Sequence, residues 1–65
     1  MLAIRFTNAL NQDQILNLDS VSAVEKPNAQ KSLMFYYGKE HMTINFKTIE
    51  DRDEVYDRIC KLCDL

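Results

Sequence analysis

Large apolar side chains alternate with small or polar ones over residues 2–7, where the even positions are apolar, and residues 41–47 show the same alternation. A period of two is typical of strands with one buried face. The inward side chains of the second segment are expected to be Met42, Ile44 and Phe46. Residues 32–37 are rich in strand-forming side chains, and Gly38, the only glycine of the chain, follows them. We therefore predict a β-hairpin that turns at residues 38–40.

Residues 14–26 form a second extended stretch with a less regular pattern. Leu16 and Leu18 share one parity, Val21 and Ala23 take the other, and Val24 returns to the first. An unbroken strand would expose half of these side chains, so we expect a bend near residues 19–20 and two short strands or one kinked strand. Residues 27–30 contain the only proline and no large apolar side chain. They are predicted to form an exposed loop.

The period changes at Thr48, which stands three residues before Asp51 as in the cap that opens many helices. Acidic residues crowd the first turns and basic residues come later, which suits the helix dipole. Residues 48–64 are therefore predicted to be helical. The expected apolar stripe consists of Val55, Ile59 and Leu62, and the expected i,i+4 ion pairs are Glu54–Arg58 and Asp57–Lys61.

Together these elements predict an α+β fold in a single domain, residues 1–65. Residues 1–47 would form an antiparallel sheet of four to five strands, and the C-terminal α-helix would pack on one face of it, in the order β-β-β-β-α. The sheet side of the core would comprise Leu2, Ile4, Phe6, Leu18, Leu33, Phe35, Ile44 and Phe46. A domain of 65 residues has a marginal core, which a partner or a second copy readily supports.

The composition narrows the classes of function. Eight Lys and Arg against ten Asp and Glu give a net charge of −2, which argues against unspecific binding to nucleic acid or to an anionic membrane. No apolar run is long enough to span a bilayer, and the N-terminus lacks the layout of a signal peptide. Two cysteines are too few for a secreted disulfide framework. We therefore expect a cytoplasmic protein with reduced thiols.

Cys60 and Cys63 are the first candidates for chemistry. A structural zinc site needs four ligands, and His41 is the only further soft ligand. Both cysteines lie near the end of the predicted helix, where the carbonyl groups would raise a thiol pKa rather than lower it. Helix-packing cysteines are the interpretation we adopt. The chain offers neither a hydrolytic triad nor a glycine-rich phosphate loop, so we predict no enzyme, no catalytic residues, no metal and no cofactor.

An acidic cluster marks the start of the predicted helix. It consists of Glu50, Asp51, Asp53, Glu54 and Asp57. A solvent-exposed, charged helix face is the simplest interpretation. The alternative is that the chain is a phage or mobile-element inhibitor of a host nuclease or defence complex, and that it acts through this acidic helix.

The face of the predicted sheet that the helix leaves open is the main candidate for binding. Met34 and Tyr36 would lie at its centre, with Arg5, His41 and Lys47 around them, which is the composition of an interface with a polar rim. A protein partner or a second copy of the chain would cover this face. Alternatively, Met34 and Tyr36 simply cover the backbone of their own sheet. A third hypothesis is single-stranded RNA or DNA binding on the aromatic sheet face.

One resemblance to a known family rests on spacing. The pattern Ile15-x-x-Leu18-x-x-Val21-x-x-Val24-Glu25, then Leu33-x-Phe35, a glycine turn, Ile44-x-Phe46 and a capped helix resembles the later part of small bacterial and phage PH-like modules. It covers residues 14–62, and since a full PH-like barrel has seven strands, it implies a half-PH-like fold. Such modules mostly bind proteins, peptides or lipid headgroups, but no basic headgroup loop is visible here. We therefore expect a non-catalytic protein–protein binding module, from a bacterium or a phage.

Overall fold

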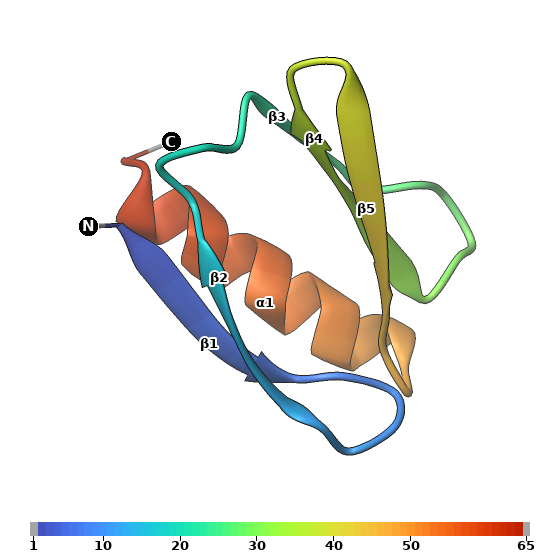
Figure 1. Cartoon of the computed structure of the whole chain (residues 1–65). Coiled ribbons are helices and arrows are strands. Elements are labelled where there is room, and N and C mark those ends of the chain that lie inside the picture. The colour runs from blue at the N-terminus through green and yellow to red at the C-terminus, as the bar shows by residue number, and fades with distance from the viewer. Residues whose placement is uncertain (1, 65) are drawn as a thin grey trace.

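The computed structural model describes residues 2–64, which form five strands followed by one helix (Figure 1). The elements are β1 Ala3–Thr7, β2 Asp13–Asn17, β3 Ala23–Glu25, β4 Ser32–Tyr37, β5 Glu40–Asn45 and α1 Ile49–Leu62. All strand pairs are antiparallel. The α+β class and the C-terminal helix are as predicted from the sequence.

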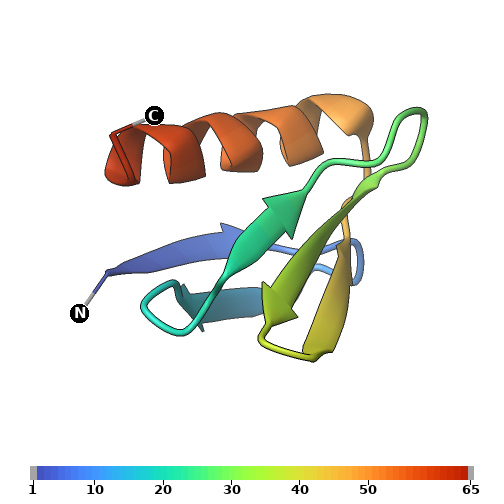
Figure 2. The same cartoon turned by 90° about the horizontal axis from the view of Figure 1, so that it is seen from above.

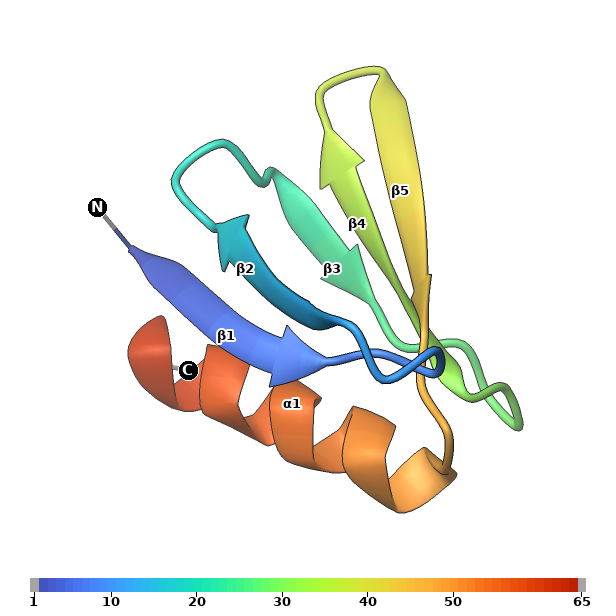
Figure 3. The ribbon, with the colours of Figure 1, turned by 60° about the horizontal axis from the view of Figure 1, so that its bottom comes forward.

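The five strands form two sheets, which corrects the prediction of one continuous sheet. β1 pairs with β2, and the second sheet has the order β3-β4-β5. β2 and β3 run next to each other in Figure 3, but no ladder joins these two described strands. The chain leaves β2 through a turn in which Asn17 Oδ1 accepts a hydrogen bond from the N–H of Asp19 at 2.9 Å. The expected bend is therefore present. It lies between the end of β2 at Asn17 and the start of β3 at Ala23, and these two strands belong to different sheets.

The core lies where α1 packs across one side of the strands (Figure 2). Leu33 and Phe35 on the central strand β4 are completely buried, and burying one such side chain stabilises a fold by about 1.5–3 kcal/mol. The buried apolar residues are Ile4, Phe6, Leu16, Leu18, Leu33, Phe35, Ile44, Phe46, Val55 and Ile59. Of the predicted sheet residues, Leu2 is the one that is only partly buried.

Two residues that were expected inside are exposed. Met42 is 37% exposed although its partner Phe35 is completely buried, because β5 is an edge strand with a neighbour on one side only. Leu62 is 46% exposed, because the buried face of α1 is formed one turn earlier, by Arg52, Val55 and Ile59. The buried apolar stripe of the helix therefore ends at Ile59 and does not include Leu62, which the sequence pattern had added to it.

The predicted local signals at both ends of β5 are present. Gly38 has a φ of 64° and begins a two-residue turn between the paired residues Tyr37 and Glu40. Thr48 Oγ1 accepts a hydrogen bond from the N–H of Asp51 at 3.0 Å, so Thr48 caps α1.

Glu54 and Arg58 form the expected i,i+4 ion pair at 3.7 Å. No ion pair joins the expected partners Asp57 and Lys61 in the described part of the chain.

Arg52 joins α1 to the loop between β3 and β4. Its side chain is almost fully buried, and Nη1 donates to the carbonyl oxygens of Pro27 and Gln30 at 2.7 and 2.6 Å. Nη2 and Nε donate to Asp53 Oδ1 at 2.8 and 3.0 Å. A buried guanidinium is stable only when it is hydrogen-bonded, and each of its three nitrogens has at least one acceptor here. The loop over residues 27–30 is largely exposed, as predicted, and Arg52 holds its backbone at Pro27 and at Gln30.

This anchoring also explains an unusual backbone angle. Ala29, between the two bound carbonyl groups, has a φ of 60°, which costs a residue other than glycine about 1–2 kcal/mol. Such a conformation persists only where neighbouring contacts enforce it. The bonds from Arg52 to Pro27 and Gln30, on either side of Ala29, are such contacts.

Truncation of the helix face tests the packing. Ile59 is 4% exposed, so Ile59→Ala is expected to lower the free energy of unfolding by about 2–5 kcal/mol, enough to unfold a marginal domain. Thermal and urea unfolding followed by circular dichroism would measure this. Leu62→Ala is the matched control, since Leu62 is largely exposed and its loss should have a small effect. If Ile59→Ala and Leu62→Ala lowered the stability equally, the face of α1 that packs on the strands would not be the one that carries Ile59.

Removal of the buried guanidinium tests the anchor. Arg52→Ala is expected to lower the free energy of unfolding by about 2–4 kcal/mol, because charged hydrogen bonds to two carbonyl groups and Asp53 are lost. Arg52→Lys should recover only part of this loss, since an ammonium group lacks the planar fork. Arg58→Ala, on the same helix but exposed, should cost less than about 1 kcal/mol in the same urea titration. An Arg52→Ala protein as stable as Arg58→Ala would contradict the proposed anchor.

Candidate functional site

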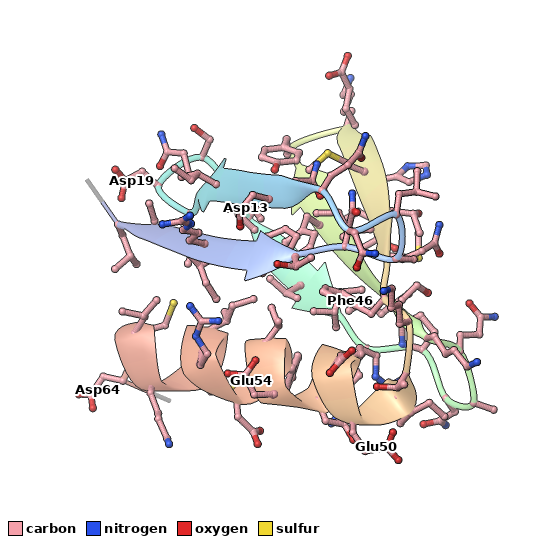
Figure 4. The ribbon with its side chains drawn as sticks, turned by 90° about the horizontal axis from the view of Figure 1, so that it is seen from below. Asp13, Asp19, Phe46, Glu50, Glu54 and Asp64 are labelled. Atoms are coloured by element: carbon pink, nitrogen blue, oxygen red, sulfur yellow. The ribbon has the colours of Figure 1, made fainter. Side chains whose placement is uncertain are left out.

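A groove of about 610 Å³ lies between β1 and the first half of α1. Its apolar surface comes from Phe6, Phe46 and Val55, which belong to the edge of the core. Figure 4 labels Phe46 together with Asp13 and Glu54, which come from β2 and α1 and also line the groove. The remaining lining residues are Arg5, Thr7, Asn8, Asn11, Lys47, Asp51 and Arg58. The groove therefore combines an apolar floor with polar and charged walls.

The wall formed by β1 is an open strand edge. Ile4 and Phe6 pair with Leu16 and Gln14, and the N–H of Leu18 donates to the carbonyl of Leu2 at 2.7 Å, so the even residues bond to β2. Because N–H and C=O groups of a strand alternate in direction, those of the odd residues 3, 5 and 7 point away from β2. The helix confirms this direction, since Arg58 Nη2 donates to the carbonyl of Arg5 at 2.8 Å.

The charges around the groove are balanced. Arg5 and Asp13 form an exposed ion pair at 2.6 Å, and Arg5, by hydrogen bond and charge, lowers the pKa of the Asp13 carboxyl. Arg58 lies beside Glu54 at 3.7 Å. Lys47 and Asp51 also line the groove, and neither belongs to an ion pair among the described residues. With three bases and three acids in its lining, the groove favours neither a polyanion nor a polycation.

The five residues predicted to form one interface are divided between two places. Tyr36 and His41 are neighbours on the outer face of the three-stranded sheet, with ring centroids 5.9 Å apart, and the Tyr36 hydroxyl lies 3.9 Å from the Met34 sulfur. Arg5 and Lys47, in contrast, line the groove beside α1. Of the predicted rim, only His41 therefore lies beside Tyr36, because Arg5 belongs to the other sheet and Lys47 follows the end of β5.

Met34 and Tyr36 are also less exposed than we expected. Both are half-buried, and the Tyr36 hydroxyl donates to Glu25 Oε1 on the neighbouring strand at 3.4 Å. Burial, with a smaller contribution from the charge and hydrogen bond of Glu25, raises the pKa of Tyr36. These contacts agree with the alternative that Met34 and Tyr36 cover the backbone of their own sheet.

The acidic residues of α1 do not form one free surface. Asp53 is paired with Arg52 at 2.8 Å and lies 3.9 Å from the ammonium of Lys26. Asp51 and Glu54 line the groove, whereas Glu50 and Asp57 are exposed elsewhere on the helix. The predicted acidic cluster is thus split between a structural contact, the groove and the solvent.

The two cysteines lie beside a second, smaller cavity. It measures about 210 Å³ and is mostly apolar, with Leu18, Val21 and Val24 on one side and Tyr56 and Ile59 on the other. Cys60 is half-buried at this cavity, Cys63 is exposed, and both are free thiols. No group of three or more His, Cys, Asp or Glu side chains within residues 2–64 is arranged to hold a metal ion.

Comparisons with known proteins found no match among protein-family models, curated proteins or solved structures. The resemblance to PH-like modules therefore stays a hypothesis. Among the described residues, α1 is too short and too polar to be a membrane-spanning helix. The groove itself was not predicted from the sequence, because the sequence pattern placed the helix on the strand over residues 2–7 but did not show a hollow between them. The one indication in the sequence was that Arg5 and Thr7 are the polar residues that alternate with the buried residues of this strand.

Removal of both thiols tests the interpretation of the cysteines. Cys60→Ser combined with Cys63→Ser is expected to change the free energy of unfolding by less than about 1 kcal/mol, because Cys63 is exposed, Cys60 is only half-buried, and both are free thiols. Urea unfolding of the double variant would measure this. Elemental analysis of wild-type protein purified without added metal is the complementary measurement. Stoichiometric zinc in that sample would overturn the interpretation.

Proposed function

We propose that this chain is a non-catalytic protein-binding module that takes up an extended segment of a partner along the open edge of β1. One observation carries the proposal: the outward N–H and C=O groups of β1 lie beside a groove with an apolar floor. A strand added to such an edge gains main-chain hydrogen bonds, and its alternate side chains enter the neighbouring groove.

The dimensions and the chemistry of the groove suit this kind of ligand. β1 has five residues, and a strand of that length extends about 17 Å. A partner N–H that bonds the carbonyl of Arg5 would take the place of the Arg58 guanidinium. One row of partner side chains would then lie on Phe6, Phe46 and Val55, and the other row would face solvent.

The balanced charges of the groove favour a polypeptide over nucleic acid or an anionic lipid. Binding of proteins or peptides is also what the resemblance to PH-like modules implies, and we keep the half-PH-like fold as part of the proposal. The two free thiols accord with a reducing compartment, so we propose the cytoplasm of a bacterium or of a phage-infected cell. The nuclease-inhibitor and single-strand hypotheses gain no specific support from the geometry.

Selection from a random linear peptide library displayed on phage tests the proposal. We expect peptides that bind with micromolar affinity and that protect or shift the backbone amides of residues 3–7 in NMR spectra. Thr7→Pro should weaken their binding at least about tenfold, because it removes an outward N–H without breaking a bond to β2.

Thr7→Val is the matched control, since valine keeps the N–H and the branched shape, and it should bind like the wild type. Methylation of alternate backbone nitrogens in a selected peptide should also abolish binding. The proposal is contradicted if no selected peptide affects residues 3–7, or if Thr7→Pro binds as well as Thr7→Val.

A further inference from the structure

A second open strand edge lies on the opposite side of the molecule, along β5 (Figure 3). β5 pairs with β4 on one side only. The N–H of Phe46 donates to the carbonyl of Lys31 in the β4 direction at 2.7 Å, so the even residues of β5 bond to β4. The odd residues 41, 43 and 45 therefore direct their N–H and C=O groups outward.

Only part of this edge is available. The outward carbonyl of Asn45 accepts a hydrogen bond from the N–H of Ala9 at 2.8 Å, so the loop after β1 covers the end of β5. His41 and Thr43 are exposed, and their outward backbone groups have no partner among the described residues. β5 itself contains neither proline nor lysine, the residues that often protect an edge from pairing.

We infer that this edge pairs with the same edge of a second copy of the chain, antiparallel and with the twofold axis at Met42. In this register His41 lies opposite Thr43 of the second copy, and Thr43 lies opposite His41 of the second copy. The four outward groups on each chain then form about four hydrogen bonds between the copies. The two three-stranded sheets become one continuous sheet.

The side chain at the axis supports this register. Met42 is 37% exposed on the inner face of β5, and at the axis it meets Met42 of the second copy. Residues opposite each other without hydrogen bonds have their Cα atoms only about 4.5 Å apart, so each methionine covers the other. The pairing thus buries the apolar side chain that α1 leaves exposed.

The neighbouring registers are less favourable. An axis at His41 would bring two imidazole rings together, and an axis at Thr43 would require the Asn45 backbone that already bonds to Ala9. With the axis at Met42, Glu40 lies opposite Ile44, so no like charges meet. This self-complementarity is the reason we commit to a second copy rather than to an unrelated strand.

Sedimentation equilibrium and NMR line widths over protein concentrations up to about 1 mM test the inference. We expect a reversible dimer, weak because the shared edge is short. Thr43→Pro removes an outward N–H and leaves the bonds to β4 intact, so it should raise the dimer dissociation constant at least about tenfold. Thr43→Val is the matched control and should dimerise like the wild type.

Two charge variants test the position of the axis, even where Thr43→Pro fails to fold. Met42→Asp and Met42→Lys should each remain monomeric, because each places like charges together at the axis. An equimolar mixture of the two should form a heterodimer, because opposite charges then meet. A wild type that stays monomeric over the whole range, or a mixture that does not associate, would overturn the inference. Thr7→Pro should leave the dimer intact, which separates this edge from the peptide groove.

Discussion

The buried guanidinium of Arg52 is the contact on which the arrangement of helix and sheet depends. It lies on the face of α1 that packs on the core, yet its donors bond to the carbonyl groups of Pro27 and Gln30 and to Asp53. The loop supplies the two carbonyl acceptors, and the Asp53 carboxylate balances the charge of the guanidinium. In so small a core, a satisfied ionic contact adds directional specificity that apolar packing alone does not supply.

Lys26 and Tyr56 extend the same contact along the helix. The Lys26 ammonium lies 4.5 Å from the centre of the Tyr56 ring and 3.9 Å from Asp53 Oδ1. The segment after β3 is therefore held to α1 at successive points, and the three-stranded sheet is fixed relative to the helix. With the helix held there, its other side lies beside β1, where the charged walls of the groove are formed.

The hairpin and the helix could be predicted because their signals are local. Alternation, Gly38 and the Thr48 cap each act within a few residues, and each has the expected geometry. Burial of Arg52 had no such signal, since the two carbonyl groups that it bonds lie more than twenty residues earlier in the sequence. Strand parity grouped Arg5 and Lys47 with Met34 and Tyr36 on one face, whereas the structure places Arg5 and Lys47 in the groove beside α1. Parity shows which residues of one strand lie on the same face. Whether the faces of two strands form one surface depends on whether the strands belong to one sheet, and the break between β2 and β3 divides them into two.

The hydrogen bond from Ala9 to Asn45 has a consequence for communication between the two open edges. Ala9 belongs to the loop that continues from β1, and Asn45 ends β5, so this bond fastens one sheet to the other. A ligand that moves this loop as it occupies the groove would release the Asn45 carbonyl and lengthen the free edge of β5 by one acceptor. Any such effect is thermodynamically reciprocal: pairing at β5 would alter affinity at β1 by the same factor. A single backbone hydrogen bond would thus couple the two binding edges that we propose.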